Sequence, residues 1–395
     1  MVNALIIGVT VITGAILLYP RLANAPLWRA AITPLASIIG SGFLVLGPIL
    51  DASYGRDALL VMAALCFVAY LFGAAIRFNI RHVEGQSNDS AIRRLENASS
   101  WALAFAYIVS VAYYLNLLGA FAVSLTDLND AFHAKLVTSG VFIVILLVGW
   151  TQGFGAPERM EQVTVGVKLS IIMGLLFGLG WFFAERAGAG ELMVKPSQIH
   201  GWAAVTLAFG LLVTVQGFET SRYLGEEYDA ETRIRSMRLA QWLSAAIYMI
   251  YIAFLSFSFA PDMIELNETA IIDLMAIVAP ILPMLLIAAA LSAQFRAAVA
   301  DTGGAGGLVA ELTRGRMTAR MGYAALVAAG LTLTWGMSVF EIVSYASRAF
   351  AFYYALQSSI AAKAAVKHGQ TARAGLFAGL GVLGLAILIF GAPVE

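Results

Sequence analysis

Charged residues are what this sequence has least of. Only 12% of its residues are Asp, Glu, Lys or Arg, and their formal charges sum to zero, whereas a soluble domain has about 25% charged residues. Hydrophobic residues make up 60% of the chain, which excludes an ordinary soluble domain. The neutral balance gives no indication of nucleic-acid binding. We therefore expect the lipid bilayer to surround this protein.

Cysteine and histidine are also scarce. The single Cys66 lies within an apolar run, which excludes a disulfide framework and a cysteine-based metal site. The histidines His82, His133, His200 and His368 fall in or beside predicted loops. The sequence has no HExxH or GxSxG motif and no intramembrane pair of His and carboxylate. We expect no enzyme activity, no cofactor and no bound metal.

Long hydrophobic runs dominate the chain. They last about 18 to 25 residues, the length at which a helix crosses roughly 30 Å of hydrocarbon, and they do not alternate as barrel strands do. The fold class we predict is an all-α polytopic membrane protein. The predicted helices are twelve, at 2–19, 30–50, 57–76, 100–125, 136–152, 163–184, 201–222, 238–259, 270–298, 321–338, 340–362 and 373–391.

The loops differ in positive charge. Of the 24 Lys and Arg residues, 17 lie in the odd-numbered predicted loops and four in the alternate ones. Cytoplasmic loops carry the excess of positive charge, so both termini are expected on the non-cytoplasmic side, in a bacterial inner (cytoplasmic) membrane. A helix wrongly added or omitted would move all later loops to the other side of the membrane and remove this bias. The bias therefore also supports the helix count.

The chain reads as one transmembrane domain over residues 1–395. Its longest predicted loops, near 77–99 and 223–237, are too short to bury a separate core. The first apolar run, 2–19, lacks a preceding basic segment, because Arg21 is the first charged residue. We expect that run to be a retained helix.

The second predicted helix contains a break. The stretch Pro34 to Pro48 reads PLASIIGSGFLVLGP, with Gly40, Ser41 and Gly42 in the middle of an apolar run. Each Gly costs about 1 kcal/mol relative to Ala in a helix, and Pro lacks a backbone donor. One interpretation is an unwound segment whose backbone groups bind a ligand. The other is a close helix contact through small residues.

A second break is predicted five spans later. The run from Leu207 reads LAFGLLVTVQGFETSRYL, with Gly217 among apolar residues and Glu219 two positions on. Two interrupted helices at this separation suggest an inverted repeat around a central site. The first repeat would cover 30–184 and the second 201–362, leaving 2–19 and 373–391 as peripheral helices.

These motifs resemble those of the amino acid-polyamine-organocation (APC) permeases. The resemblance rests on GSGF at 40–43, on QGFE at 216–219 followed by EE, and on the run GFGAPERMEQVTVGVKLSIIMGLL at 153–176. It extends over about residues 30–365 and implies a LeuT-type fold. It also implies that the protein carries a small-molecule substrate, an amino acid or a related amine.

The resemblance assigns substrate contacts to both breaks. Amides of the first break would receive the substrate carboxylate, in keeping with the positive end of a half-helix dipole. The second break would meet the amino group and side chain. The residues so implied are Ile39, Gly40, Ser41, Gly42 and Phe43 in the first break, and Val213, Thr214, Gln216, Gly217 and Phe218 in the second.

Gating or coupling would fall on three further residues. In sodium-independent relatives a lysine at the position of Lys168 replaces a sodium ion and braces the first break, here toward Gly40 and Ser292. The alternative is that Lys168 extends to the headgroups. Glu219 resembles the acidic residue of the family's gate, and the alternative is an interfacial pair with Arg222.

Two arginines have no common role in the family. Arg296 and Arg348 lie in or near predicted helices, where an ionisable group is costly. If they faced the cavity, they would suit a second anionic group on the substrate. The alternative is structural pairing with Asp301 or Glu341.

Taken together, the sequence predicts a secondary transporter for amino acids or related organic amines that works by alternating access. The rival hypothesis is a membrane sensor or accessory subunit with the same fold, which binds but does not transport. Neither the exact substrate nor the oligomeric state follows from the sequence.

Overall fold

The computed structural model describes residues 1–40, 42–84, 89–151, 153, 158–260, 263 and 266–394, and for 158–161 it describes the backbone alone. Within these ranges the regular elements are helices. Seven segments among them are long and apolar enough to cross a membrane. The predicted class, an all-α polytopic membrane protein, is confirmed.

The first half of the chain begins its helices with recognisable local signals. Pro20 and Pro26 occupy the first helical positions of α2 and α3, where a missing N–H costs nothing. Asp89 caps α6 by accepting from the N–H of Ala91. The elements are α1 (Val2–Leu17), α2 (Pro20–Ala23), α3 (Pro26–Ile38), α4 (Gly42–Tyr54), η1 (Gly55–Asp57), α5 (Ala58–His82), α6 (Ser90–Val123), α7 (Ala131–Thr151) and α8 (Glu158–Ala189).

The second half uses similar caps. Asp229 accepts from the N–H of Thr232 at the start of α10, and Ser338 and Glu341 form a capping box on α14. The elements are α9 (Gly201–Gly210), η2 (Leu212–Val215), η3 (Phe218–Tyr223), α10 (Ala230–Ser258), α11 (Ala270–Val278), α12 (Leu282–Leu312), α13 (Ala319–Gly336), α14 (Val339–Lys367) and α15 (Thr371–Phe390).

One predicted helix, 270–298, is wrong in both extent and continuity. The chain breaks after Val278 and resumes at Leu282, where Pro283 starts a new helix. That helix then continues to Leu312 through the glycine-rich segment 301–307, which the sequence pattern places in a loop. Gly306 allows close packing there, since a Cβ on it would lie 2.2 Å from the ring of Tyr323 on α13.

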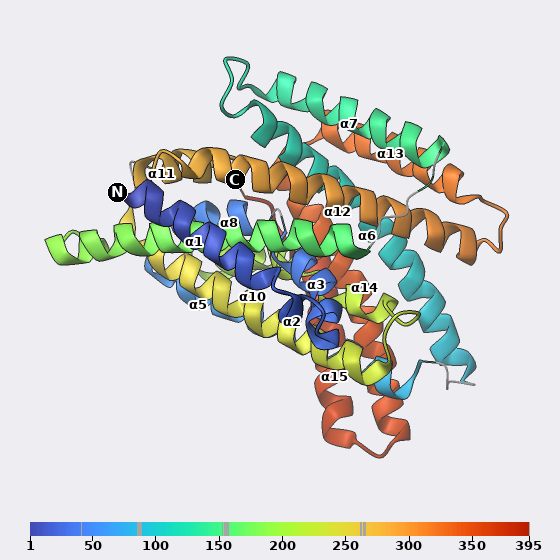
Figure 1. Cartoon of the computed structure of the whole chain (residues 1–395). Coiled ribbons are helices and arrows are strands. Elements are labelled where there is room, and N and C mark those ends of the chain that lie inside the picture. The colour runs from blue at the N-terminus through green and yellow to red at the C-terminus, as the bar shows by residue number, and fades with distance from the viewer. Residues whose placement is uncertain are drawn as a thin grey trace.

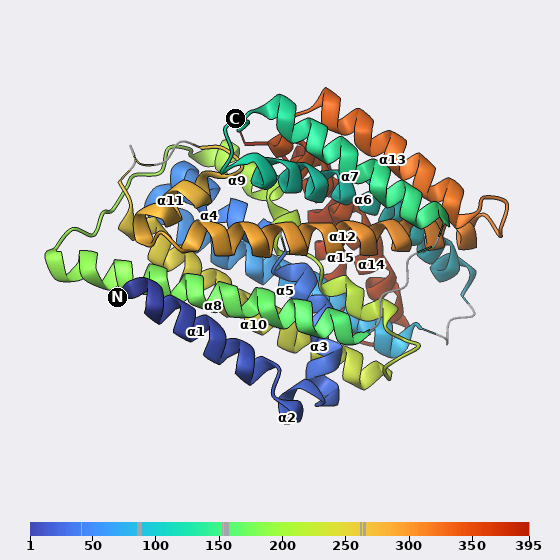
Figure 2. The same cartoon turned by 45° about the horizontal axis from the view of Figure 1, so that its top comes forward.

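The helices form one bundle in which neighbours in space are often distant in sequence. Figures 1 and 2 show α12 passing through the middle of the bundle, with α7 and α13 side by side at one edge and α1 lying along α8 at the other. Helix α6 packs against both α12 and α14. The interrupted segments meet within this arrangement, where α3 packs against η3 and α4 packs against η2.

Helix α8 receives α1 in a stripe of small residues spaced four apart, Gly166, Ser170, Gly174 and Gly178. A Cβ on Gly174 would lie 2.2 Å from Oγ1 of Thr10. Small residues on one helix face let a neighbouring helix approach closely, as in other membrane helix pairs. Helix α1 is therefore fitted to α8, the helix that carries Lys168.

Candidate functional site

The first interruption separates α3 from α4. Helix α3 ends at Ile38, Ile39 leaves the helical region with φ −87° and ψ 61°, and α4 starts at Gly42. Ser41, which the resemblance implies as a substrate contact, lies outside the described residues. The predicted break in the second membrane segment is therefore present.

The second interruption separates α9 from the short 3-10 helix η3. Helix α9 ends at Gly210, the chain continues as the 3-10 turn η2, and Gln216 is extended. Gly217 follows with φ +118°, a backbone conformation that residues with a Cβ rarely adopt. This glycine allows the chain to pass from η2 to η3 through that conformation.

The two interruptions touch each other. A Cβ built on Gly217 would lie 2.5 Å from Cβ of Ser37, in the last turn of α3. A Cβ built on Gly42 would lie 2.9 Å from Cα of Thr214. Both distances are shorter than real Cβ contacts, so the backbones approach this closely because glycine occupies these positions.

Backbone groups at the breaks are satisfied by side chains from other helices. The hydroxyl of Tyr248 on α10 donates to Ile38 O at 3.1 Å and also to Thr214 O. Ser347 on α14 donates to Gly210 O at 2.6 Å and accepts from Val213 N–H at 2.9 Å. Buried helix ends need such partners. Tyr248 attaches both broken segments to α10, and Ser347 attaches the second one to α14.

The side chain of Lys168, on α8, reaches the C-terminal end of α3. Its side chain is only 7% exposed, and its Nζ donates to Ala36 O at 2.8 Å. The last carbonyls of a helix carry its partial negative charge, so a cation is stabilised there. This contact is the geometry expected for a lysine that braces the first break, and it differs from extension to the headgroups.

Glu219 lies at the start of η3. It is 1% exposed, accepts from Gly217 N–H at 3.0 Å and accepts from the hydroxyl of Tyr354 at 2.7 Å. Arg222, the alternative partner considered from the sequence, pairs with Glu96 at 2.6 Å. Each break thus has a side chain of the sign that suits its helix end: Lys168 at carbonyls and Glu219 at an N–H.

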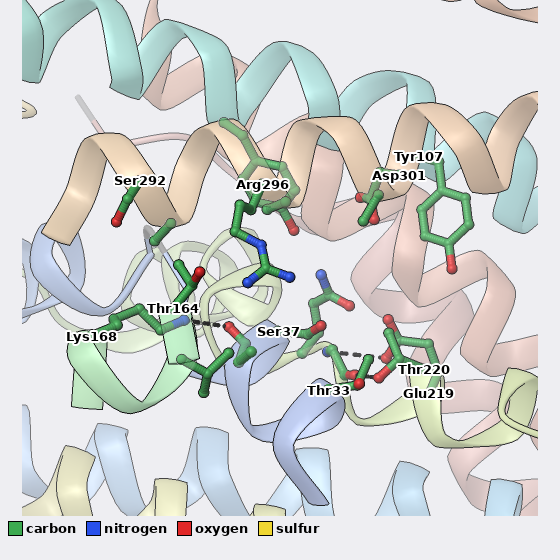
Figure 3. Close-up of a pocket in the computed structure, with 18 of the residues that line it drawn as sticks. Thr33, Ser37, Tyr107, Thr164, Lys168, Glu219, Thr220, Ser292, Arg296 and Asp301 are labelled. Atoms are coloured by element: carbon green, nitrogen blue, oxygen red, sulfur yellow. Dashed lines mark hydrogen bonds between the residues drawn. The ribbon is translucent and has the colours of Figure 1, made fainter. Parts of the chain in front are cut away.

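A polar cavity of about 180 Å³ lies against both breaks. Figure 3 shows Arg296 and Asp301 entering it from α12, Lys168 from α8 and Glu219 from η3. The cavity is thus lined by two cations and two carboxylates. The lining residues are Thr33, Ala36, Ser37, Tyr107, Tyr114, Thr164, Val165, Lys168, Gln216, Gly217, Glu219, Thr220, Ser292, Ala293, Arg296, Ala297, Ala300, Asp301 and Phe350.

Part of the site suggested by the sequence lines this cavity. The lining includes Gln216, Gly217, Lys168, Glu219, Ser292 and Arg296. The other suggested residues lie at the breaks without lining it: Ile39, Gly40, Gly42, Phe43, Val213, Thr214 and Phe218.

The two phenylalanines at the breaks pack inside the protein. Phe43 contacts the rings of Tyr248 and Tyr251, and Phe218 stacks on Tyr354 with 5.2 Å between ring centroids. The aromatic rings that line the cavity are instead Tyr107, Tyr114 and Phe350. Adjacency to a glycine break is therefore a poor guide to which rings meet the cavity.

Arg348 lies outside the cavity lining. Its Nε donates to Leu388 O at 2.7 Å, and its guanidinium lies over the ring of Tyr345, 5.4 Å from the centroid. The hydrogen bond to Leu388 O attaches α14 to α15. Arg348, expected as a possible cavity charge, binds a backbone carbonyl on α15 instead.

Several lining residues were not singled out from the sequence. Thr33 and Ser37 are four residues apart on α3, and Ser292, Arg296 and Ala300 follow the same spacing on α12. A spacing of four puts side chains on one helix face. Two polar residues at this spacing in an apolar helix were the signal that could have pointed to Thr33 and Ser37, whereas the positions four and eight residues before Asp301 are alanines.

Interrupted membrane helices that meet at a charged cavity are typical of secondary transporters. Comparison with protein families agrees: the family model of an APC superfamily transporter matches residues 20–391. This chain belongs to the APC superfamily of transporters. It is also 42% identical over 387 residues to a protein of Aquifex aeolicus (strain VF5) described as uncharacterized, covering 96% of this chain and 94% of that protein.

Proposed function

We propose that the protein is a secondary active transporter that moves amino acids or related organic amines by alternating access. One observation carries the proposal: the two helix breaks touch, and the charged cavity lies against both. A site between two interrupted helices changes its exposure when one group of helices rocks against the rest. Its volume of about 180 Å³ is below the ~300–1,000 Å³ of drug-sized pockets, which favours a small solute.

The position of Lys168 supports a mechanism without sodium. Its ammonium already supplies a positive charge to the carbonyl end of α3, through Ala36 O. A sodium ion bound there would duplicate that charge at close range, which is unfavourable. Transport is therefore driven by protons or by exchange with a counter-substrate.

Liposome uptake tests the proposal. The purified protein is reconstituted, and uptake of labelled amino acids and amines is followed under a pH gradient, a sodium gradient or an internal counter-substrate. We expect uptake with the first or third condition and no sodium requirement. Sodium-dependent uptake would overturn the role of Lys168, and no uptake under any condition would overturn transport.

A paired substitution separates the site from general damage. Gly42→Val directs a side chain into Thr214, whereas a Cβ added to Gly140 on α7 would have no atom within 4 Å, so Gly140→Val is the matched control. We expect Gly42→Val to abolish the thermal shift produced by a transported solute, and Gly140→Val to retain it. A shift that persists in Gly42→Val puts the binding site elsewhere.

A sensor that binds without transport is the second candidate. Helix α1 favours it, because this helix precedes the residues matched by the family model, 20–391, and packs along α8. Saturable binding of a solute in a protein that gives no uptake or exchange would identify this case.

A further inference from the structure

Helix α12 presents a single face to the cavity. The residues concerned fall at positions i, i+4 and i+8, which lie on one side of a helix. They are Ser292 and Ala293, Arg296 and Ala297, Ala300 and Asp301. All but two of them are small or carry only a hydroxyl, so the charged groups that this face offers are Arg296 and Asp301.

Arg296 lies near the middle of the 31-residue helix α12. An ionisable group at such depth in a membrane helix faces a polar cavity or a partner, and marks a functional site. Figure 3 shows its guanidinium directed into the cavity, between Lys168 and Glu219. Arg296 also interacts within the protein, and its planar fork of five N–H donors allows it to serve several acceptors at once, carboxylates in particular.

Asp301 lies five residues farther along the same helix, about 7.5 Å along the axis. Its Oδ2 accepts a hydrogen bond from Ser110 on α6. Among the described residues it forms no salt bridge, and a carboxylate offers about four lone-pair positions. The acid is therefore held in place by one hydroxyl while it keeps the capacity to accept from an ammonium group.

The other two charges of the cavity are engaged at the helix breaks. Lys168 donates to Ala36 O, and Glu219 accepts from Gly217 N–H and Tyr354. Lys168 and Glu219 lie at the breaks, whereas Arg296 and Asp301 are the oppositely charged pair on the face of α12 that lines the cavity. The cavity has no net formal charge from these four groups, which suits a solute that is itself neutral overall.

We propose that Arg296 and Asp301 determine substrate specificity, with Arg296 binding the carboxylate and Asp301 the ammonium group of a free, zwitterionic amino acid. This inference rests on the proposed transport function and narrows it, because an amine without a carboxylate leaves Arg296 without its ligand. The cavity volume of about 180 Å³ suits a small solute of this kind. The substrate lies beside the breaks, against the face of α12.

Matched sets of three solutes test the inference. Each set contains an amino acid, the amine that lacks its carboxylate and the acid that lacks its amino group: alanine, ethylamine and propionate; leucine, isopentylamine and 4-methylpentanoate; phenylalanine, phenethylamine and 3-phenylpropionate. Inhibition of labelled amino acid uptake gives the affinities. In the wild type we expect both analogues to bind about 10- to 100-fold more weakly, the effect of losing one charged hydrogen-bonded group.

The variants assign each end of the solute. Arg296→Gln should weaken the amino acid about 10- to 100-fold and leave the amine unchanged, so that discrimination disappears, and Arg296→Lys should restore part of it. Asp301→Asn should weaken the amino acid and the amine and leave the deaminated acid unchanged. Arg348→Gln is the control, since that arginine lies outside the cavity, and it should preserve all the ratios.

The outcomes separate this inference from the proposed function. Uptake of an amino acid with equal affinity for its amine overturns the inference and leaves transport intact, and this comparison needs no variant. Unchanged ratios in Arg296→Gln, or ratios altered equally in Arg348→Gln, overturn it as well. Failure of every solute in the wild type overturns the transport function on which it rests.

Discussion

The contact between the two helix breaks depends on the absence of a side chain at Gly217. Its φ of +118° and the Ser37 atoms beside it both exclude a Cβ, for independent reasons. A substitution there cannot relax by a side-chain rotation, because Ser37 C, a backbone atom, lies 2.6 Å from the position a Cβ would take. The contact between the two breaks therefore depends on this position.

We expect Gly217→Ala to lower the free energy of unfolding by about 2–4 kcal/mol, the sum of backbone strain and overpacking. Thermal unfolding in detergent measures it. Gly140→Ala is the control, since Gly140 is helical with no atom within 4 Å of a Cβ, and it should be neutral or stabilising by about 0.5–1 kcal/mol. Equal stability of both variants would show that the breaks do not touch as described.

Lys168 is expected to matter more for transport than for stability. Lys168→Met keeps the length of the side chain and removes the donor to Ala36 O, so the carbonyl end of α3 loses its cation. We expect uptake to fall at least about tenfold, the effect of roughly 1.4 kcal/mol, while the protein remains folded.

The matched control for Lys168→Met is Lys135→Met. Lys135 also donates to a backbone carbonyl, Met337 O at 3.5 Å, but it lies outside the cavity lining. Normal uptake in both variants would remove Lys168 from the mechanism. A loss in both would point to a general effect of removing a lysine.

At the scale of elements, the contact of α1 with α8 makes a geometric prediction. A Cβ on Gly14 would lie 3.7 Å from Cβ of Ser170, within the roughly 3.5–4.5 Å of disulfides. In a background without the single cysteine, Cys66→Ala, the pair Gly14→Cys and Ser170→Cys should therefore form a disulfide on mild oxidation. Gel mobility after cleavage of the chain between the two helices measures it.

A further substitution tests whether the small-residue stripe creates that contact. Adding Gly174→Leu to the cysteine pair should abolish the disulfide, because a side chain there meets Thr10 at 2.2 Å. Gly188→Leu, on the same helix but with no atom within 4 Å, should leave the disulfide unchanged. A disulfide that survives Gly174→Leu would mean that α1 does not depend on the stripe.

The same scale shows what could be predicted from the sequence. The length of the apolar runs predicted the helices, because backbone groups in lipid must be hydrogen-bonded within a helix. The glycines within those runs predicted both breaks, because glycine is unfavourable inside a helix. They failed at 301–307, where glycines serve close packing inside α12. Glycine can end a helix or let another helix approach it closely. Which of the two occurs depends on the helix that packs against it.

The cavity lining was harder to predict than the breaks. Lys168 and Arg296 could be singled out, since a charge inside an apolar run needs an explanation. The spacing of Thr33 and Ser37 shows that they share a helix face, but which face meets the cavity, and that Asp301 lines it, depends on how α3, α8 and α12 pack together. Arg348 looked equivalent to Arg296 in sequence, yet its side chain binds α15.

At the scale of the whole molecule, the distribution of positive charge predicts the orientation in the membrane. Seventeen of the 24 Lys and Arg residues lie in one set of the loops predicted from the sequence, and this side should face the cytoplasm. Alkaline phosphatase fused after residue 394 should then be active and a fluorescent protein there dark, with the reverse for fusions at Gly315. The opposite pattern at either position would reverse the orientation.

The cavity volume also has a consequence for water. A space of about 180 Å³ has room for several water molecules. Because charged side chains line the cavity, these waters are well hydrogen-bonded. A solute gains affinity only if it replaces the hydrogen bonds of the waters it displaces. Binding is therefore close to an exchange of solvent for solute, with a small net free energy, which is what lets a carrier release its cargo as readily as it takes it up.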